Sequence, residues 1–202
     1  MNLLELKATR ETYQYVPARL IRATNDREPD LNWKSLKLVM DIPKGWDSGN
    51  HDIRSQYSSI ELDEFHYSLL QSEREYELIH GLLSIVFWGF ASGTNGRINS
   101  KRALRRAEAI VIGRKNAPPQ PDADIISHIK KCRQLLNASQ IALAFREATQ
   151  IKFLQMAFAS KLLTFMAPNL AAVYDDVISK QLLMRANTPE LQNLFVSTKN
   201  PT

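Results

Sequence analysis

The chain divides into two unequal parts by its pattern of apolar and polar residues. From about residue 59 onward, apolar side chains recur three and four residues apart, which is the spacing of amphipathic helices. Residues 1–58 lack this period and are interrupted by prolines and glycines, with short β-leaning runs at 12–16 and 36–40. We therefore predict a mainly α protein: a helical domain over 59–202 and an irregular, partly stranded N-terminal lobe over 1–58, together forming one compact unit.

Start and stop signals divide the second part into about eight helices. Ser100 is the expected N-cap of a helix that ends near Gly113, and Asp122 or Asp124 is the expected N-cap of the helix after the proline-rich linker 116–121. The helices are predicted at 59–71, 73–91, 100–113, 122–137 and 139–149, followed by a long apolar helix to 167 and shorter ones that begin near 175 and 188.

Two apolar stretches, 78–96 and 153–174, are predicted to be buried core helices and not membrane spans. The first turns polar after residue 91, and the second carries Lys161 near its middle together with Pro168. The N-terminus has no apolar signal segment. The single cysteine, Cys132, allows no internal disulfide and no four-cysteine iron–sulfur cluster. We expect a cytoplasmic protein that needs neither a cofactor nor a metal.

The charge of the chain is unevenly distributed. Its formal net charge is +5, but residues 1–96 hold 10 basic and 14 acidic side chains, a net of −4, whereas residues 97–202 hold 16 and 7, a net of +9. Basic residues are densest just after the first long apolar helix, where like charges repeat four residues apart at a cost of about 0.2–0.5 kcal/mol per pair. Phosphates would relieve this repulsion, so we predict that DNA binds here. The predicted contacts are Arg97, Lys101, Arg102, Arg105 and Arg106.

Lys161 is the only charged residue between positions 153 and 168. On a helix it shares a face with Phe158 and Phe165, so the amine is expected to lie in apolar surroundings, where a neutral, nucleophilic form becomes accessible. The alternative is a structural lysine whose ammonium reaches water at a helix end. A short loop then leads to Asp175, at the start of the next predicted helix.

A helix with a buried lysine, a proline-ended loop and an aspartate at the next N-terminus resembles the helix-hairpin-helix DNA glycosylases of the 8-oxoguanine type, closest to their archaeal branch. The similarity covers about residues 145–190, through the segments around Lys161 and Asp175. It implies that Lys161 attacks the sugar C1′ and that Asp175, with Asp176 as its rival, assists. The glycine-rich hairpin that usually precedes the lysine is missing.

The resemblance implies a monomeric enzyme that flips a modified base out of DNA and cleaves its N-glycosidic bond, with or without AP-lyase activity. The expected substrate is an oxidised purine such as 8-oxoguanine, or a hypermodified phage base such as glucosylated hydroxymethylcytosine if the protein serves anti-phage defence. A flipped base needs aromatic walls. Trp88, Phe165 and Phe195 are the candidates for this pocket. The competing hypotheses are a non-enzymatic helical DNA-binding regulator and a module that binds an acidic protein partner.

Overall fold

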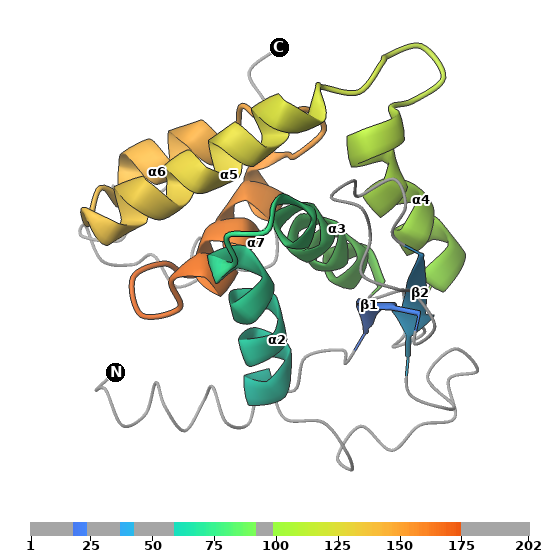
Figure 1. The fold of residues 1–202 in the computed structure, drawn as a ribbon, viewed down its shortest axis with the longest axis horizontal. Helices are drawn as coiled ribbons and strands as arrows, with labels where there is room; N and C mark the ends of the chain where they lie inside the picture. Colours follow the sequence, from blue (N-terminus) through green and yellow to red (C-terminus); the bar gives the residue numbers. More distant parts are fainter. Residues whose placement is uncertain (1–17, 24–36, 43–58, 92–98, 175–202) are drawn as a thin grey trace, which may run out of the picture.

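The computed structural model describes residues 18–23, 37–42, 59–91 and 99–174. Within these ranges the protein is mainly helical, with six helices and one two-stranded antiparallel sheet (Figure 1). The strands are β1 (Arg19–Arg22) and β2 (Leu38–Asp41), and the helices are α2 (Ser59–Gln71), α3 (Glu75–Ala91), α4 (Ser100–Ile112), α5 (Asp122–Asn137), α6 (Ile141–Ala148) and α7 (Met156–Met166). The predicted mainly helical class is confirmed, and both strands lie within residues 1–58, where strands were predicted.

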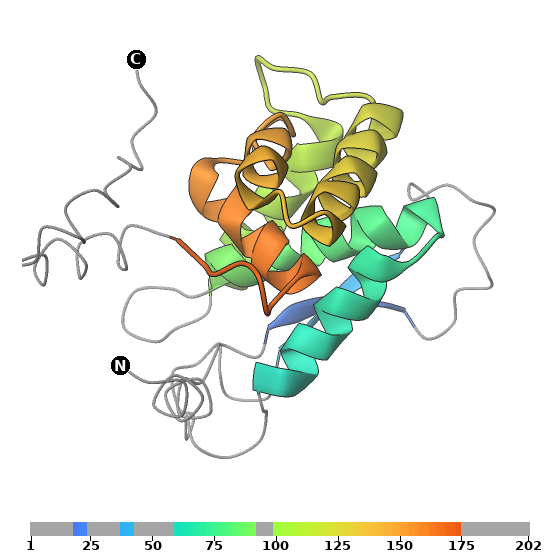
Figure 2. The same cartoon turned by 90° about the vertical axis from the view of Figure 1, so that its left-hand side faces the viewer.

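Helix α3 is the centre of the fold. It is apolar nearly all round, as a helix must be when other elements cover every side. It contacts α2, α4, α5, α7 and β1, and in Figure 1 these elements surround it. The view in Figure 2, turned by 90°, shows α5 and α6 side by side on the face opposite the sheet. One hydrophobic cluster therefore joins all six helices and the first strand.

Strand β1 is held to α3 by a buried polar network. The Leu20 amide donates to Ser84 Oγ at 3.0 Å, and His80 Nε2 donates to the Leu20 carbonyl at 2.7 Å. His66 donates from Nδ1 to the Leu62 carbonyl at 2.9 Å, so its Nε2 must accept from the Ser84 hydroxyl, also at 2.9 Å. Side chains of α3 thus form hydrogen bonds with the Leu20 backbone groups of β1 that do not pair with β2.

Burial keeps both histidines of this network neutral. Desolvation lowers the pKa of His66 from 6.5 to about 3 and also lowers the pKa of His80. The Nδ1 atom of His80 is buried without a hydrogen-bond partner. These histidines are structural groups that fasten the sheet to the helical core.

The bounds of α2 to α6 agree with the predicted ones to within two residues, whereas their caps and the start of α7 differ. The helices predicted to begin near 175 and 188 lie outside the described residues. Asn99, and not Ser100, caps α4, with its Oδ1 accepting from the Arg102 amide at 3.2 Å. Pro121 occupies the N-cap position of α5, so the predicted side-chain cap by Asp122 or Asp124 is wrong. The helix begins directly after Pro121, so both carboxylates lie in its first turn, where their negative charge interacts favourably with the helix dipole.

The long apolar helix predicted up to residue 167 begins later than expected. Helix α6 ends at Ala148 and α7 begins at Met156, with a turn over 149–155 between them. The Thr149 hydroxyl and the Gln150 side-chain amide both donate to the Arg146 carbonyl. These side-chain hydrogen bonds compete with the backbone hydrogen bonds that would continue the helix. Phe153 has a left-handed backbone conformation, φ 70°, within this turn. Helices α6 and α7, joined by this turn, therefore form a helix–turn–helix unit in which the second helix begins only at Met156.

Candidate functional site

Lys161 lies in the second helix of this unit and is buried, with 8% of its surface exposed. The apolar surroundings predicted from the sequence are confirmed: Phe158, one turn earlier, has its ring centroid 5.5 Å from Lys161 Nζ. Such an ammonium–ring contact contributes about 0.5–1 kcal/mol at an exposed site and more when water is excluded. The lysine therefore has an aromatic neighbour of α7 on one side and α3 on the other.

Gly89 of α3 makes this arrangement possible. A Cβ atom at position 89 would lie 2.5 Å from Cε1 of Phe158 and 3.3 Å from Cδ of Lys161. The first distance is shorter than any real Cβ contact, so the phenyl ring occupies space that only glycine leaves open. The sequence signal for this contact is a glycine inside an otherwise apolar helix, which often marks close packing.

A row of four side chains connects Lys161 to helix α4. The Phe158 ring stacks on Phe90 of α3, with centroids 4.4 Å apart and planes at 27°. On Phe90 in turn lies the Arg106 guanidinium, whose central carbon is 5.5 Å from the ring centroid. We call Phe90 and Phe158 the aromatic bridge. Sequence reasoning missed its role, because the two rings are far apart in the chain and meet only through the packing of α3 against α7.

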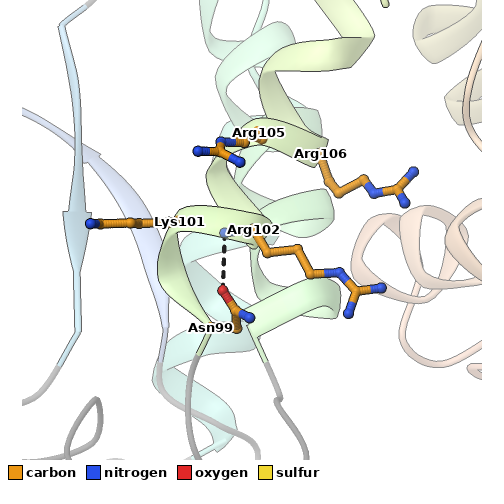
Figure 3. Close-up of a pocket in the computed structure, with 5 residues that line it drawn as sticks. All are labelled: Asn99, Lys101, Arg102, Arg105 and Arg106. Carbon is orange, nitrogen blue, oxygen red and sulfur yellow. Dashed lines mark hydrogen bonds between the residues drawn. The ribbon is translucent and has the colours of Figure 1, made fainter.

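The basic residues of α4 share one face of the helix, on which Lys101, Arg102 and Arg105 are exposed and Arg106 is half-buried. Its opposite face carries the apolar residues Ala103, Ala107 and Ile110, which are buried against α3. In Figure 3 the basic side chains leave the helix in two rows, Lys101 with Arg105 toward the sheet and Arg102 with Arg106 away from it. They line an open hollow of about 490 Å³ together with Asn99.

This α4 face carries positive charge without internal compensation in the described part of the chain. The ion pairs there involve other residues, such as Arg19 with Asp41 at 2.7 Å and Lys130 with Glu75 at 2.8 Å. Four cations that form no ion pair with the described residues, within six consecutive positions of one helix, create a local field that favours a polyanion. Of the five predicted DNA contacts, Arg97 lies outside the described residues, and the other four share this face.

Ser160, directly before Lys161, holds the chain that follows the helix. Its Oγ accepts from the Tyr174 amide at 2.9 Å and contacts the carbonyl oxygens of Tyr174 at 3.0 Å and Ala157 at 2.9 Å. Asp175 is the next residue in the sequence and, like Asp176, lies outside the described residues. The structure therefore brings the residue before the predicted carboxylate to the residue before the predicted nucleophile.

The aromatic residues predicted to line a base pocket have different surroundings from those expected. Trp88 and Phe165 are buried, with 7% and 3% exposure, and their rings meet edge to face at a centroid distance of 5.2 Å. Phe165 also lies against the His66 ring, 4.5 Å away. Both rings thus fill the core between α2, α3 and α7. Their role in a pocket stays a prediction, and Phe195 lies outside the described residues.

Residues that could hold a metal ion do not gather in the part of the chain that the structure describes. Within the same ranges, every helix is too short or too polar to cross a bilayer. Comparison of the chain with models of protein families, with curated proteins and with solved structures returned no match.

Proposed function

We propose that this protein binds DNA through the α4 face and excises a modified base with Lys161 as the nucleophile. The observation that carries the proposal is the row Arg106–Phe90–Phe158–Lys161, because it joins the basic α4 face to a buried amine. Phosphates held on α4 would place the DNA backbone on the side of the molecule where the amine lies. The resemblance of residues 145–190 to oxoguanine-type glycosylases supports the same roles.

The chemistry needs an amine that is kept from water. In the proposed step Lys161 Nζ first releases one ammonium proton to bulk water, before DNA covers the site. The lone pair of the neutral amine then forms a bond to the sugar C1′, while the bond from C1′ to the base nitrogen breaks and the base leaves with the bonding pair. Asp175 would stabilise the positive charge that develops on the sugar, with Asp176 as the alternative. Loss of the amine proton and ring opening then give a Schiff base, which can be reduced and isolated.

Two kinds of modified base are candidate substrates. An oxidised purine such as 8-oxoguanine agrees with the resemblance, and a glucosylated hydroxymethylcytosine of phage DNA agrees with a role in defence. Trp88 and Phe165 pack against each other in the core, so a bulky base would be received beside the aromatic bridge more readily than between these two rings. A panel of duplexes that contain each base separates the two substrates.

The test is borohydride trapping combined with base release on this panel of duplexes. Wild type is expected to form a covalent complex with one of them, and Lys161→Gln is expected to form none while retaining DNA affinity. Lys152→Gln is the matched control: this lysine precedes α7, its ammonium donates to the Pro118 carbonyl, and it should trap normally. Base release by Lys161→Gln at the wild-type rate would refute the role of the lysine.

A second candidate function, DNA binding without catalysis, is favoured by the α4 face alone. For binding through this face, Arg102→Gln/Arg106→Gln and Lys101→Gln/Arg105→Gln should each reduce the slope of log affinity against log salt by about 1.8, since each pair contacts two phosphates. Salt dependence that survives both double variants would refute binding through α4. Loss of affinity with no trapping on any duplex would favour a regulator over a glycosylase.

A further inference from the structure

We infer that Ser160 is a positioning residue that sets the distance between the Lys161 amine and the chain that carries Asp175. This inference rests on the proposed function and adds a residue that the resemblance does not name. It starts from a hydroxyl that is 4% exposed and bound to both backbone groups of one distant residue, Tyr174. We call this contact the Ser160–Tyr174 clamp.

The stoichiometry of the clamp shows why a hydroxyl is required at position 160. A hydroxyl has one proton and two acceptor sites. The Tyr174 amide uses an acceptor site at 2.9 Å, and the single proton is divided between the carbonyls of Tyr174 at 3.0 Å and Ala157 at 2.9 Å. Alanine at position 160 would leave the Tyr174 amide without this acceptor and release the chain there from α7.

The connection between α7 and the clamp is also fastened by hydrogen bonds. The Met166 carbonyl accepts from the Gln71 side-chain amide at 3.1 Å, which ties the end of α7 to α2. The amides of Leu170 and Ala171 donate to the Ala167 carbonyl at 2.9 and 3.0 Å, which forms a turn. The backbone is therefore held at residues 166–171 and again at Tyr174, the residue that precedes Asp175 in the sequence.

Placement of this kind has a large effect on rate. A misplacement of about 1 Å at a catalytic group can cost roughly 100-fold in rate without weakening binding. Since the clamp contacts neither the α4 face nor the aromatic bridge, its loss should leave DNA affinity unchanged. We therefore expect Ser160→Ala to lower the single-turnover rate of base excision by roughly 10- to 100-fold at constant DNA affinity.

Thr164→Ala is the matched control. Thr164 is one turn further along α7, and its hydroxyl donates to the Ser160 carbonyl at 2.9 Å, so this variant also loses a side-chain bond to the helix but leaves the clamp intact. Ser160→Thr keeps a hydroxyl and should restore both the clamp and the rate. Hydrogen exchange of the Tyr174 amide reports the clamp without any substrate, and Ser160→Ala should accelerate it by about tenfold or more.

The outcomes distinguish this inference from the proposed function. Unchanged exchange at Tyr174 in Ser160→Ala would overturn the clamp, whatever the activity. Faster exchange in Ser160→Ala with an unchanged excision rate would overturn the positioning role and leave the proposed function standing. A Ser160→Thr variant that regains the exchange protection of Tyr174 but not the excision rate would have the same meaning. A wild type that excises no base from any duplex would refute the proposed function, and with it the catalytic role of Ser160, while exchange still reports whether the clamp exists.

Discussion

Replacement of Gly89 by alanine tests the packing on which the candidate site depends. Alanine in the middle of a helix gains about 0.8–1.0 kcal/mol over glycine from helix propensity. Against this gain stands a Cβ only 2.5 Å from Cε1 of Phe158, about 1 Å inside ordinary carbon–carbon contact of roughly 3.5–4.0 Å. The ring must move, and overpacking of this kind costs about 1–3 kcal/mol. We expect Gly89→Ala to be less stable than wild type by up to about 2 kcal/mol.

The same helix provides the control. Gly81 is also inside α3, but a Cβ there would lie 3.1 Å from side-chain atoms of Leu69 and Leu70, so a shift of a few tenths of an ångström accommodates it. Gly81→Ala is therefore expected to keep or slightly raise the stability. Urea unfolding of the three proteins, with the slope of free energy against urea unchanged, measures the difference.

Function should respond more strongly than stability. Phe158 stacks on Phe90 and lies over the Lys161 ammonium, so moving its ring disturbs both contacts. Under the proposed function, Gly89→Ala should lose most of its borohydride trapping at a temperature where it remains folded, whereas Gly81→Ala should trap like wild type. A Gly89→Ala protein as stable as Gly81→Ala, with normal trapping, would refute the close packing of α3 and α7 at this point.

Three further predictions concern the core. Ser84→Ala removes the acceptor of the Leu20 amide and the donor to His66, so the free energy of unfolding should fall by about 1–3 kcal/mol for each group left unsatisfied; the exposed Ser68→Ala, which loses only a bond to the Phe65 carbonyl, should be nearly neutral. The pKa of His66 is about 3 in the folded protein and 6.5 in the unfolded chain, so between these pH values the unfolded chain binds a proton that the folded protein does not bind. Stability should thus be complete above pH 6.5 and decline as the pH falls toward 3, by up to about 1.4 kcal/mol per pH unit, and a flat unfolding free energy between pH 7 and 5 would contradict this. Burial raises the pKa of the Cys132 thiol to about 12, so a thiol reagent should label it only in denaturant, and stoichiometric labelling of the folded protein within minutes would show that the site opens.

Much of the helical architecture could be read from local signals. The spacing of apolar residues predicted α2 at its observed bounds and the end of α3 at Ala91, and Gly113 marks the end of α4 with a φ of 82°. These features depend on side-chain period and on the conformational freedom of glycine, which act over a few residues. Strand β1 gave no such signal, because its four residues are stabilised by β2 and by side chains of α3 that come more than 60 residues later.

The turn at residues 149–155 shows the limit of periodicity. Ile151 and Leu154 within the turn are apolar and buried, so the sequence predicted that the helix ending near residue 167 already includes them. The side chains of Thr149 and Gln150 instead donate to the Arg146 carbonyl, which favours a turn. The predicted caps were also misplaced, by one residue at α4 and by one or three residues at α5.

The sequence by itself determined that the protein is mainly helical, that Lys161 lies in apolar surroundings and that positive charge gathers on α4. Each of these follows from residue type and spacing along a helix. Only the tertiary structure decided which of these features meet. Phe158 packs against α3 where Gly89 leaves space, Phe90 contacts both Phe158 and the Arg106 guanidinium, and Ser160 binds the backbone of Tyr174. Such contacts join residues up to about 70 positions apart, and their cause is the packing of whole helices, which no local pattern encodes.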